Sequence, residues 1–276
     1  MIANRLLPFI AGVALAAGAL AGFLPRHGVA QSGGNPRSAT VQKVYSSAVR
    51  IQISAGGKVV RSASGVSFAR DGDRTYVLTN AHVVEPSKSW KQPIEMRVLT
   101  GGNATIAARV VAAGQLPDMD VAVVEVQDST MPITPLSVDD TLELGDDLVV
   151  IGAPFGKGLS VAAGIVSQVE YDVAESVRPR APRALKTDAA IGYGSSGGGV
   201  FDVPGGRLVG LIEGYRTARV EFGKAEEGYH FDVPMPGETF VAPAAKIRRF
   251  LAERGLSRLA GSSATASVPD TSNAKM

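Results

Sequence analysis

The chain has 276 residues, of which 45% are hydrophobic and 20% charged, as in ordinary globular proteins. It has no cysteine, which excludes disulfides and thiol chemistry, and its three histidines are widely spaced, which argues against a metal site. Beyond residue 30 the basic and acidic side chains are equal in number and form no polybasic run, so nucleic-acid binding is not expected.

The first thirty residues carry the pattern of an export signal. Arg5 precedes an uncharged apolar run, Leu6 to Leu24, and small residues follow at Gly28 and Ala30. This pattern predicts a signal peptide cleaved after Ala30, giving a periplasmic or secreted protein. The alternative is a retained anchor that attaches the protein to the inner membrane with its body in the periplasm, because an apolar run of this length just spans a bilayer.

The body of the chain, residues 40–260, is a series of short apolar or alternating segments. A polar, glycine-rich linker is expected before it at 31–39, and a disordered tail after it at 261–276, where large apolar side chains are almost absent. The predicted strands are Ala48–Ser54, Gly65–Arg70, Thr75–Asn80, Ile94–Thr100, Thr105–Ala113, Asp120–Val126, Asp146–Pro154, Ser160–Val169, Gly198–Val203, Arg207–Gly214 and Glu238–Ala244.

This spacing of strands predicts an all-β fold, a barrel or a sandwich. No long helical pattern separates consecutive strands, as a parallel α/β sheet would require. One helix is predicted at the end, Pro243–Leu256, because Ile247, Phe250 and Leu251 share a face and Gly255 supplies a stop. The architecture is therefore β-rich with a C-terminal helix.

Two serine motifs overlap in "GYGSSGG", residues 192–198. Both the G-x-S-x-G elbow of the α/β-hydrolases and the G-x-S-G-G loop of trypsin-like proteases make Ser196 the nucleophile. The elbow requires a helix directly after the serine and a histidine later in the chain. Here the turn "VPGG" follows between two strands, and the only later histidine, His230, is expected in a solvated, glycine-rich loop. These features disfavour an esterase.

The trypsin-like order of histidine, aspartate and serine fits better. His82 follows an apolar strand in "YVLTNAHVVE", Asp120 opens the strand "DVAVVEV", and Ser196 comes last. Each residue also has a plainer interpretation: a structural histidine, a strand-end carboxylate for which Asp118 is a rival, and a serine in a turn. The chain order on one all-β pattern favours nucleophilic catalysis.

At these residues the chain resembles the HtrA/Deg (DegP-like) serine proteases, trypsin-fold peptidases of the bacterial envelope. The segments "TNAHVV" and "TDAAIGYGSSGG" carry the resemblance, "IGAPFG" and "AGIVS" support it, and it extends over residues 41–256. It implies two antiparallel six-stranded β-barrels, at about 40–135 and 136–260, with the active site in the groove between them. The resemblance is to the protease domain alone; the PDZ domain that many relatives carry is not expected here.

The resemblance also implies roles for individual residues. Ser196 is the expected nucleophile, His82 the general base and Asp120 its partner, with the backbone N–H groups of Gly194 and Ser196 as the oxyanion hole. The expected substrate is an extended or unfolded polypeptide, cleaved in protein quality control or processing. No cofactor or metal is expected. A homo-oligomer is left open, because many relatives are trimers.

The expected substrate-binding residues flank the serine loop. They are Ala190, Ile191, Gly192 and Tyr193 before the loop, and Leu211, Ile212, Glu213, Gly214 and Tyr215 on a later strand. Ala190 at the position of the trypsin pocket acid suggests a small or medium aliphatic residue before the cut. Ser195 replaces the asparagine usual in the family. This departure leaves a second hypothesis, a catalytically impaired trypsin-fold module that only binds peptides.

Overall fold

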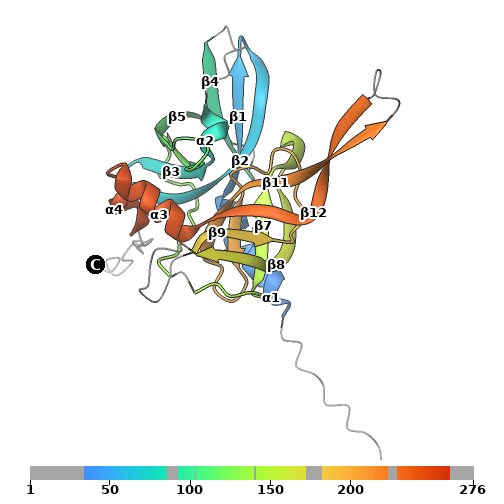
Figure 1. Cartoon of the computed structure of the whole chain (residues 1–276). Helices are drawn as coiled ribbons and strands as arrows, with labels where there is room; N and C mark the ends of the chain where they lie inside the picture. The colour runs from blue at the N-terminus through green and yellow to red at the C-terminus, as the bar shows by residue number, and fades with distance from the viewer. Residues whose placement is uncertain are drawn as a thin grey trace, which may run out of the picture. The chain divides into compact units, whose positions relative to one another are not determined.

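The structure is a computed structural model that describes residues 34–85, 93–102, 104–139, 141–171, 182–222 and 229–261. The expected export signal and the expected tail after residue 261 lie outside these ranges. The described residues from Asn35 onward belong to one compact unit (Figure 1). Among them, no helix has both the length and the apolar character needed to cross a membrane.

Two closed barrels of six antiparallel strands make up this unit, which confirms the expected fold class. The first has the strand order β1-β2-β3-β6-β5-β4 and the second β10-β11-β12-β9-β8-β7. The strands are β1 Ala48–Ala55, β2 Lys58–Asp71, β3 Arg74–Thr79, β4 Ile94–Thr100, β5 Thr105–Ala113, β6 Ala122–Val126, β7 Asp147–Gly152, β8 Ser160–Tyr171, β9 Pro182–Thr187, β10 Gly199–Asp202, β11 Leu208–Phe222 and β12 Tyr229–Pro243.

Each barrel is filled by β-branched and aliphatic side chains, which suit a pleated and buried surface. Ile51, Val77 and Val124 lie in the first interior, and Val150 and Val209 lie in the second. In β6 all five residues are buried. Alternate residues face the barrel interior, and the two between them are covered by the apolar cluster that joins the barrels and by an ion pair with β5. The apolar run that predicted a strand here therefore reflects burial on both faces.

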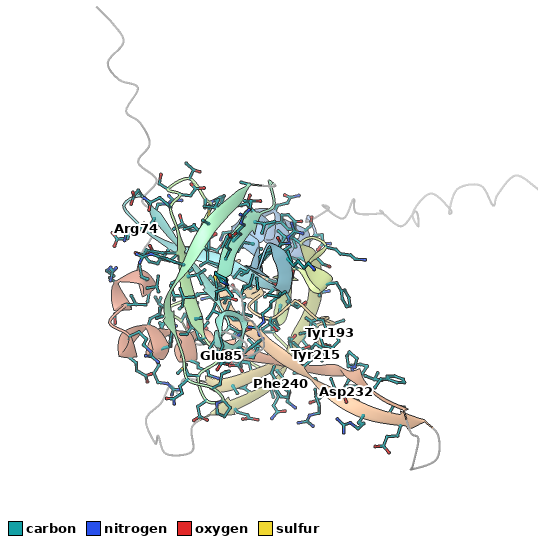
Figure 2. The ribbon with its side chains drawn as sticks, turned by 90° about the horizontal axis from the view of Figure 1, so that it is seen from above. Arg74, Glu85, Tyr193, Tyr215, Asp232 and Phe240 are labelled. Atoms are coloured by element: carbon teal, nitrogen blue, oxygen red, sulfur yellow. The ribbon has the colours of Figure 1, made fainter. Side chains whose placement is uncertain are left out.

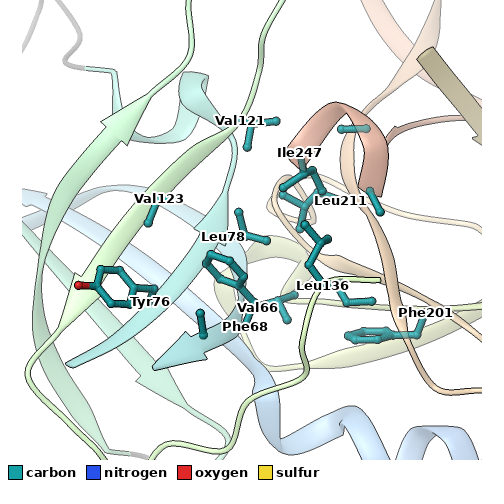
Figure 3. Packing of buried hydrophobic residues seen from close by; sticks show 14 of the residues in the cluster. Val66, Phe68, Tyr76, Leu78, Val121, Val123, Leu136, Phe201, Leu211 and Ile247 are labelled. Carbon is teal, nitrogen blue, oxygen red and sulfur yellow. The ribbon is translucent and has the colours of Figure 1, made fainter. Parts of the chain in front are cut away.

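A separate apolar cluster joins the two barrels (Figure 3). Val66, Leu78 and Val121 of the first barrel belong to the same cluster as Leu211 of the second and Ile247 of helix α3, Ala244–Glu253. Because interiors are close-packed, this cluster fixes how the barrels sit on one another. It therefore sets the positions of the loops that meet at their junction.

Helices close both ends of the described chain. Helix α1, Pro36–Val44, packs on the second barrel, where Thr40 Oγ1 donates a hydrogen bond to the Val203 carbonyl (2.7 Å). Residues 36–39 of the expected linker are thus helical. At the other end, α3 is shorter than the predicted helix: Pro243 is its N-cap, Gly255 follows its end at φ 68°, and a second short helix, α4 Ser257–Ala260, comes next.

Four strands differ clearly from the sequence expectation. β2 begins at Lys58, well before the predicted Gly65, because it pairs with β1 from the turn after Ala55 onward. β9 was not predicted, since "PRALKT" has neither clear alternation nor a continuous apolar run. β11 and β12 run well beyond the predicted segments because they pair with each other as far as Phe222 and Tyr229. The expected loop around His230 is wrong: this residue lies in β12, opposite Glu221.

Shortening Ile247 to alanine is expected to lower the free energy of unfolding by about 2–5 kcal/mol, because its side chain is fully buried in the cluster between the barrels. Chemical denaturation of the purified protein measures this. Glu253→Gln, on the exposed side of the same helix, is the control and should stay within about 0.5 kcal/mol of wild type. Equal stability of both variants would contradict the joining role of the cluster.

Candidate active site

His82 lies in a single helical turn, α2 Ala81–Val84, directly after β3. The turn is fixed from β2 by Arg61, whose Nη1 donates to the carbonyls of His82 (2.6 Å) and Val83 (2.7 Å). Burial lowers the pKa of the Arg61 guanidinium and the nearby Glu85 carboxylate partly opposes this shift, but Arg61 stays charged at neutral pH. The two hydrogen bonds from Arg61 satisfy the carbonyls of His82 and Val83, which have no intrahelical donors in so short a helix.

Asp120 contacts His82 through both carboxylate oxygens. Oδ2 lies 2.7 Å from His82 Nδ1, and Oδ1 accepts a hydrogen bond from the His82 backbone N–H (2.9 Å). The buried Asn80 side chain donates to the Asp120 carbonyl (2.8 Å), which holds the segment before β6 against the histidine turn. Asp118 is exposed and makes no such contact among the described residues. The structure therefore pairs His82 with Asp120.

The Ser196 loop lies against the end of β3. The Ser196 carbonyl accepts a hydrogen bond from the N–H of Ser64 in β2 (2.9 Å). The next residue, Gly197, has φ 79°, and a Cβ there would lie 2.4 Å from Thr79 Oγ1. Only glycine permits this backbone and this approach. Because Thr79 ends β3 two residues before Ala81, the approach brings Ser196 to the histidine turn.

In the described chain no hydrogen bond joins the Ser196 hydroxyl to the His82 ring. Such bonds are often long in free enzymes and tighten when substrate binds.

The peptide between Tyr193 and Gly194 has a fixed orientation. The Tyr193 carbonyl accepts a hydrogen bond from the Phe155 N–H (2.6 Å), and in a planar trans peptide the Gly194 N–H must then point the opposite way. The Gly194 carbonyl accepts from Ser64 Oγ (2.7 Å). Within the described residues, neither the Gly194 N–H nor the Ser196 N–H donates to a protein acceptor.

Ser195 is buried and closes a tight turn with its neighbours. Its N–H donates to the Gly192 carbonyl (3.0 Å), its carbonyl accepts from the Gly198 N–H (2.8 Å), and its Oγ lies 3.4 Å from the Gly192 N–H. The loop thus holds its shape at Ser195 mainly through backbone bonds.

Ser195 also borders a cavity of about 60 Å³ on the β7–β8 side. The cavity is lined by Val150, Gly152, Pro154, Ser160, Ala162, Ala190, Ile191, Gly192 and Ser195. The predicted residues Ala190 to Gly192 therefore line this cavity, whereas Leu211 to Tyr215 lie outside it.

Two predicted substrate-binding residues on β11 have contacts that the sequence did not indicate. The Glu213 carboxylate pairs with Lys246 of α3 (2.6 Å), so its charge is compensated. The Tyr215 ring meets the Tyr193 ring edge to face, with centroids 5.7 Å apart (Figure 2). Burial of its hydroxyl, reinforced by Tyr193, raises the pKa of Tyr215 to about 12.

Ser64, Arg61 and Phe155 position the site but were missed from the sequence. The available signal was "RSASG", residues 61–65, in which polar side chains interrupt a strand that is otherwise apolar. Among the described residues, no group of three or more histidine, aspartate or glutamate side chains is arranged to hold a metal ion.

A histidine–aspartate pair and a glycine-rich serine loop at the junction of two six-stranded barrels define a chymotrypsin-type peptidase architecture. The profile of the trypsin-like peptidase domain family matches residues 63–211, more than half of the chain, and the chain belongs to that family. The resemblance to HtrA/Deg serine proteases is confirmed by its curated relatives, which are named serine proteases and endoproteases.

One relative is the "Serine protease Do-like HtrA" of Bacillus subtilis (strain 168), 32% identical over 154 residues that cover 54% of this chain and 32% of that protein. Another is the "Probable periplasmic serine endoprotease DegP-like" of Pseudomonas fulva (strain 12-X), 33% identical over 184 residues, 66% of this chain and 34% of that protein. The chain thus spans about a third of the length of these relatives.

A solved structure shares the fold. The serine endoprotease from Yersinia pestis matches with a TM-score of 0.60 and 23% sequence identity, over 82% of this chain and 68% of that chain. This match supports the two-barrel fold described above.

Because its pKa is raised to about 12, Tyr215 in the folded protein is expected to keep its proton from pH 10 up to about pH 12, whereas an ordinary tyrosine ionises near pH 10. The unfolded chain loses this proton near pH 10, so the free energy of unfolding should fall as the pH rises from 10 toward 12. Urea unfolding at several pH values should show a smaller fall in Tyr215→Phe than in wild type. Tyr45→Phe is the control and should behave as wild type; the same fall in both variants would contradict the shift.

Proposed function

We propose that this chain is an exported serine endopeptidase that cleaves extended or unfolded polypeptide through an acyl-enzyme. Its proposed role is protein quality control or protein processing in the bacterial envelope. One observation carries the proposal. His82, held by Asp120, lies beside the serine loop, and in the described chain the N–H groups of Gly194 and Ser196 have no protein acceptor.

In the proposed reaction, Ser196 Oγ attacks the carbonyl carbon of the scissile bond while His82 Nε2 takes its proton. His82 Nδ1 faces the Asp120 carboxylate at 2.7 Å, so the proton of a neutral imidazole belongs on Nδ1 and Nε2 is left as the base. The resulting imidazolium is stabilised by Asp120 and returns the proton to the leaving amine. Water then releases the acyl group by the same steps.

Negative charge develops on the substrate oxygen in the tetrahedral state, and the Gly194 and Ser196 N–H groups are the proposed donors to it. The bonds from Phe155 to the Tyr193 carbonyl and from Ser64 Oγ to the Gly194 carbonyl support this role. They orient the peptide before substrate arrives, so little reorganisation is needed during the reaction.

The proposed substrate site lies between Ala190–Tyr193 and Leu211–Tyr215. Since Lys246 compensates Glu213, the one carboxylate within Leu211–Tyr215 is not available to hold a basic side chain. With Ala190 in place of an acid, the site favours a small or medium aliphatic residue before the cut. Export is supported by the apolar N-terminal run and by relatives whose names include the word periplasmic.

A fluorophosphonate probe, together with unfolded casein as substrate, tests the nucleophile. Labelling and cleavage are expected in wild type and in Ser195→Ala, and neither is expected in Ser196→Ala. Asp120→Asn should lower kcat by about 10⁴, because the imidazole loses its correct tautomer. Labelling and cleavage that persist in Ser196→Ala would overturn the proposal, and casein binding without turnover in wild type would establish the peptide-binding module instead.

Gly194→Ala is expected to reduce kcat/KM by about 10²–10³, the usual loss when one oxyanion donor is displaced. Its Cβ would lie 2.8 Å from the Ala153 carbonyl, so the peptide must move. Gly145→Ala is the matched control: Gly145 has the same φ of 92°, but nothing lies within 4 Å of its Cβ position. Gly145→Ala introduces the backbone strain without the clash and should keep kcat/KM near wild type. An equal loss of kcat/KM in both variants would contradict the role of Gly194 as a donor.

A further inference from the structure

Strands β11 and β12 continue past the second barrel as a two-stranded arm (Figure 1). We define the arm as Arg216–Phe222 of β11 and Tyr229–Met235 of β12, where the register runs from Thr217 opposite Pro234 to Phe222 opposite Tyr229. β10 pairs with β11 only as far as Leu211, and β9 pairs with β12 only at Thr239–Val241. Among the described residues the arm therefore has no third strand.

One edge of the arm leads directly to the nucleophile. Ile212 of β11 donates its N–H to the Gly198 carbonyl and accepts from the Gly197 N–H, both at 2.9 Å. The serine loop thus covers this edge of β11 up to Ile212, and beyond it the edge has no strand partner in the described chain. The free edge of β12 leads instead to β9, away from Ser196.

The two faces of the arm differ in chemistry. Val220 lies opposite Phe231 and Ala218 opposite Val233, and residues directly opposite each other project from the same face. Phe231 is 52% exposed, while Ala218, Val220 and Val233 are half-buried, so this apolar face is partly open to solvent. On the other face Arg219 pairs with Asp232 (3.6 Å), and Figure 2 shows Asp232 out on the arm.

We infer that the free edge of β11 beyond Tyr215 binds the part of the polypeptide substrate that precedes the scissile bond. The inference rests on the proposed function and extends its substrate site. The segment adds as a third strand, with main-chain hydrogen bonds to β11 and alternate apolar side chains beside Val220 and Phe231. An antiparallel strand runs from the tip of the arm toward Ser196, so the arm holds residues on the N-terminal side of the cut.

The arm section of β11, Arg216–Phe222, extends for about 23 Å at roughly 3.3 Å per residue. The preferred substrate is therefore a long, unfolded segment with apolar residues at alternate positions, as in a strand removed from its sheet.

A peptide length series tests this inference. One cleavable core sequence is extended by eight residues with alternating valine and serine, either before or after the cut. The N-terminal extension is expected to raise kcat/KM about tenfold or more, since several net hydrogen bonds and apolar contacts are gained. The C-terminal extension should change it less than twofold. An N-terminal extension with N-methyl groups at alternate residues should lose the gain, because it lacks strand donors.

Variants of the arm locate the effect. The double variant Val220→Ser, Phe231→Ser should lose most of the tenfold gain and cleave the short core peptide as wild type does. Val110→Ser, at an exposed valine in β5 of the first barrel, is the control and should keep the gain. A shortened arm, in which two glycines replace residues 217–234, should also lose the gain, and fluorophosphonate labelling shows whether Ser196 remains competent in each variant.

The outcomes separate two failures. Absence of labelling and of cleavage of every peptide in wild type would refute the proposed function itself. Normal cleavage with no dependence on N-terminal length would overturn the inference about the arm alone. A change in oligomeric state in the double variant, seen by sedimentation without any change in length dependence, would likewise overturn it and assign the arm to contacts between copies of the chain.

Discussion

A single buried serine on β2 connects the parts on which the site depends. Ser64 is fully buried, and its Oγ donates to the Gly194 carbonyl (2.7 Å) and accepts from the Ala153 N–H (2.7 Å). Its backbone N–H donates to the Ser196 carbonyl (2.9 Å), and its carbonyl accepts from Thr79 Oγ1 (2.8 Å). One residue of the first barrel thus fixes the serine loop, the loop after β7 and the end of β3. Every polar atom of Ser64 is used, as a position without water requires.

This concentration of bonds explains the glycines around it. Gly197 and Gly194 stand where a Cβ would lie 2.4 Å from the Ser64 carbonyl and 2.8 Å from the Ala153 carbonyl, respectively. The backbone of the serine loop can therefore reach Ser64 only without side chains at these two positions. The rigidity of the loop comes from its hydrogen bonds to neighbouring strands, since glycine itself adds conformational freedom.

The sequence indicated the parts of the site whose identity is local. His82 and Ser196 lie in short motifs whose residue types are themselves informative. Strand spacing predicted an all-β fold, and the family resemblance implied its two barrels. The sequence left Asp118 as a rival of Asp120, and the choice between them follows from contacts with Asn80 and His82, about forty residues earlier, which no local pattern encodes. The same holds for Ser64, an ordinary residue type in a strand, whose partners in the serine loop, Gly194 and Ser196, lie more than a hundred residues further on. The arm was missed because its strands are stabilised by each other rather than by burial.

The two ends of the described chain are crossed. Helix α1, which precedes the first barrel, packs on the second. At the other end, α3 lies on the second barrel and joins the cluster shared with Leu78 and Val121, and α4, directly after it, contacts β2 of the first barrel. During synthesis the strands that present His82 and Asp120 leave the ribosome long before α3, and until then one flank of the first barrel lacks its cover. The histidine and the serine reach their common position only when nearly the whole body has been made. The junction that holds the candidate active site is therefore assembled late in synthesis, after the strands of both barrels have been made.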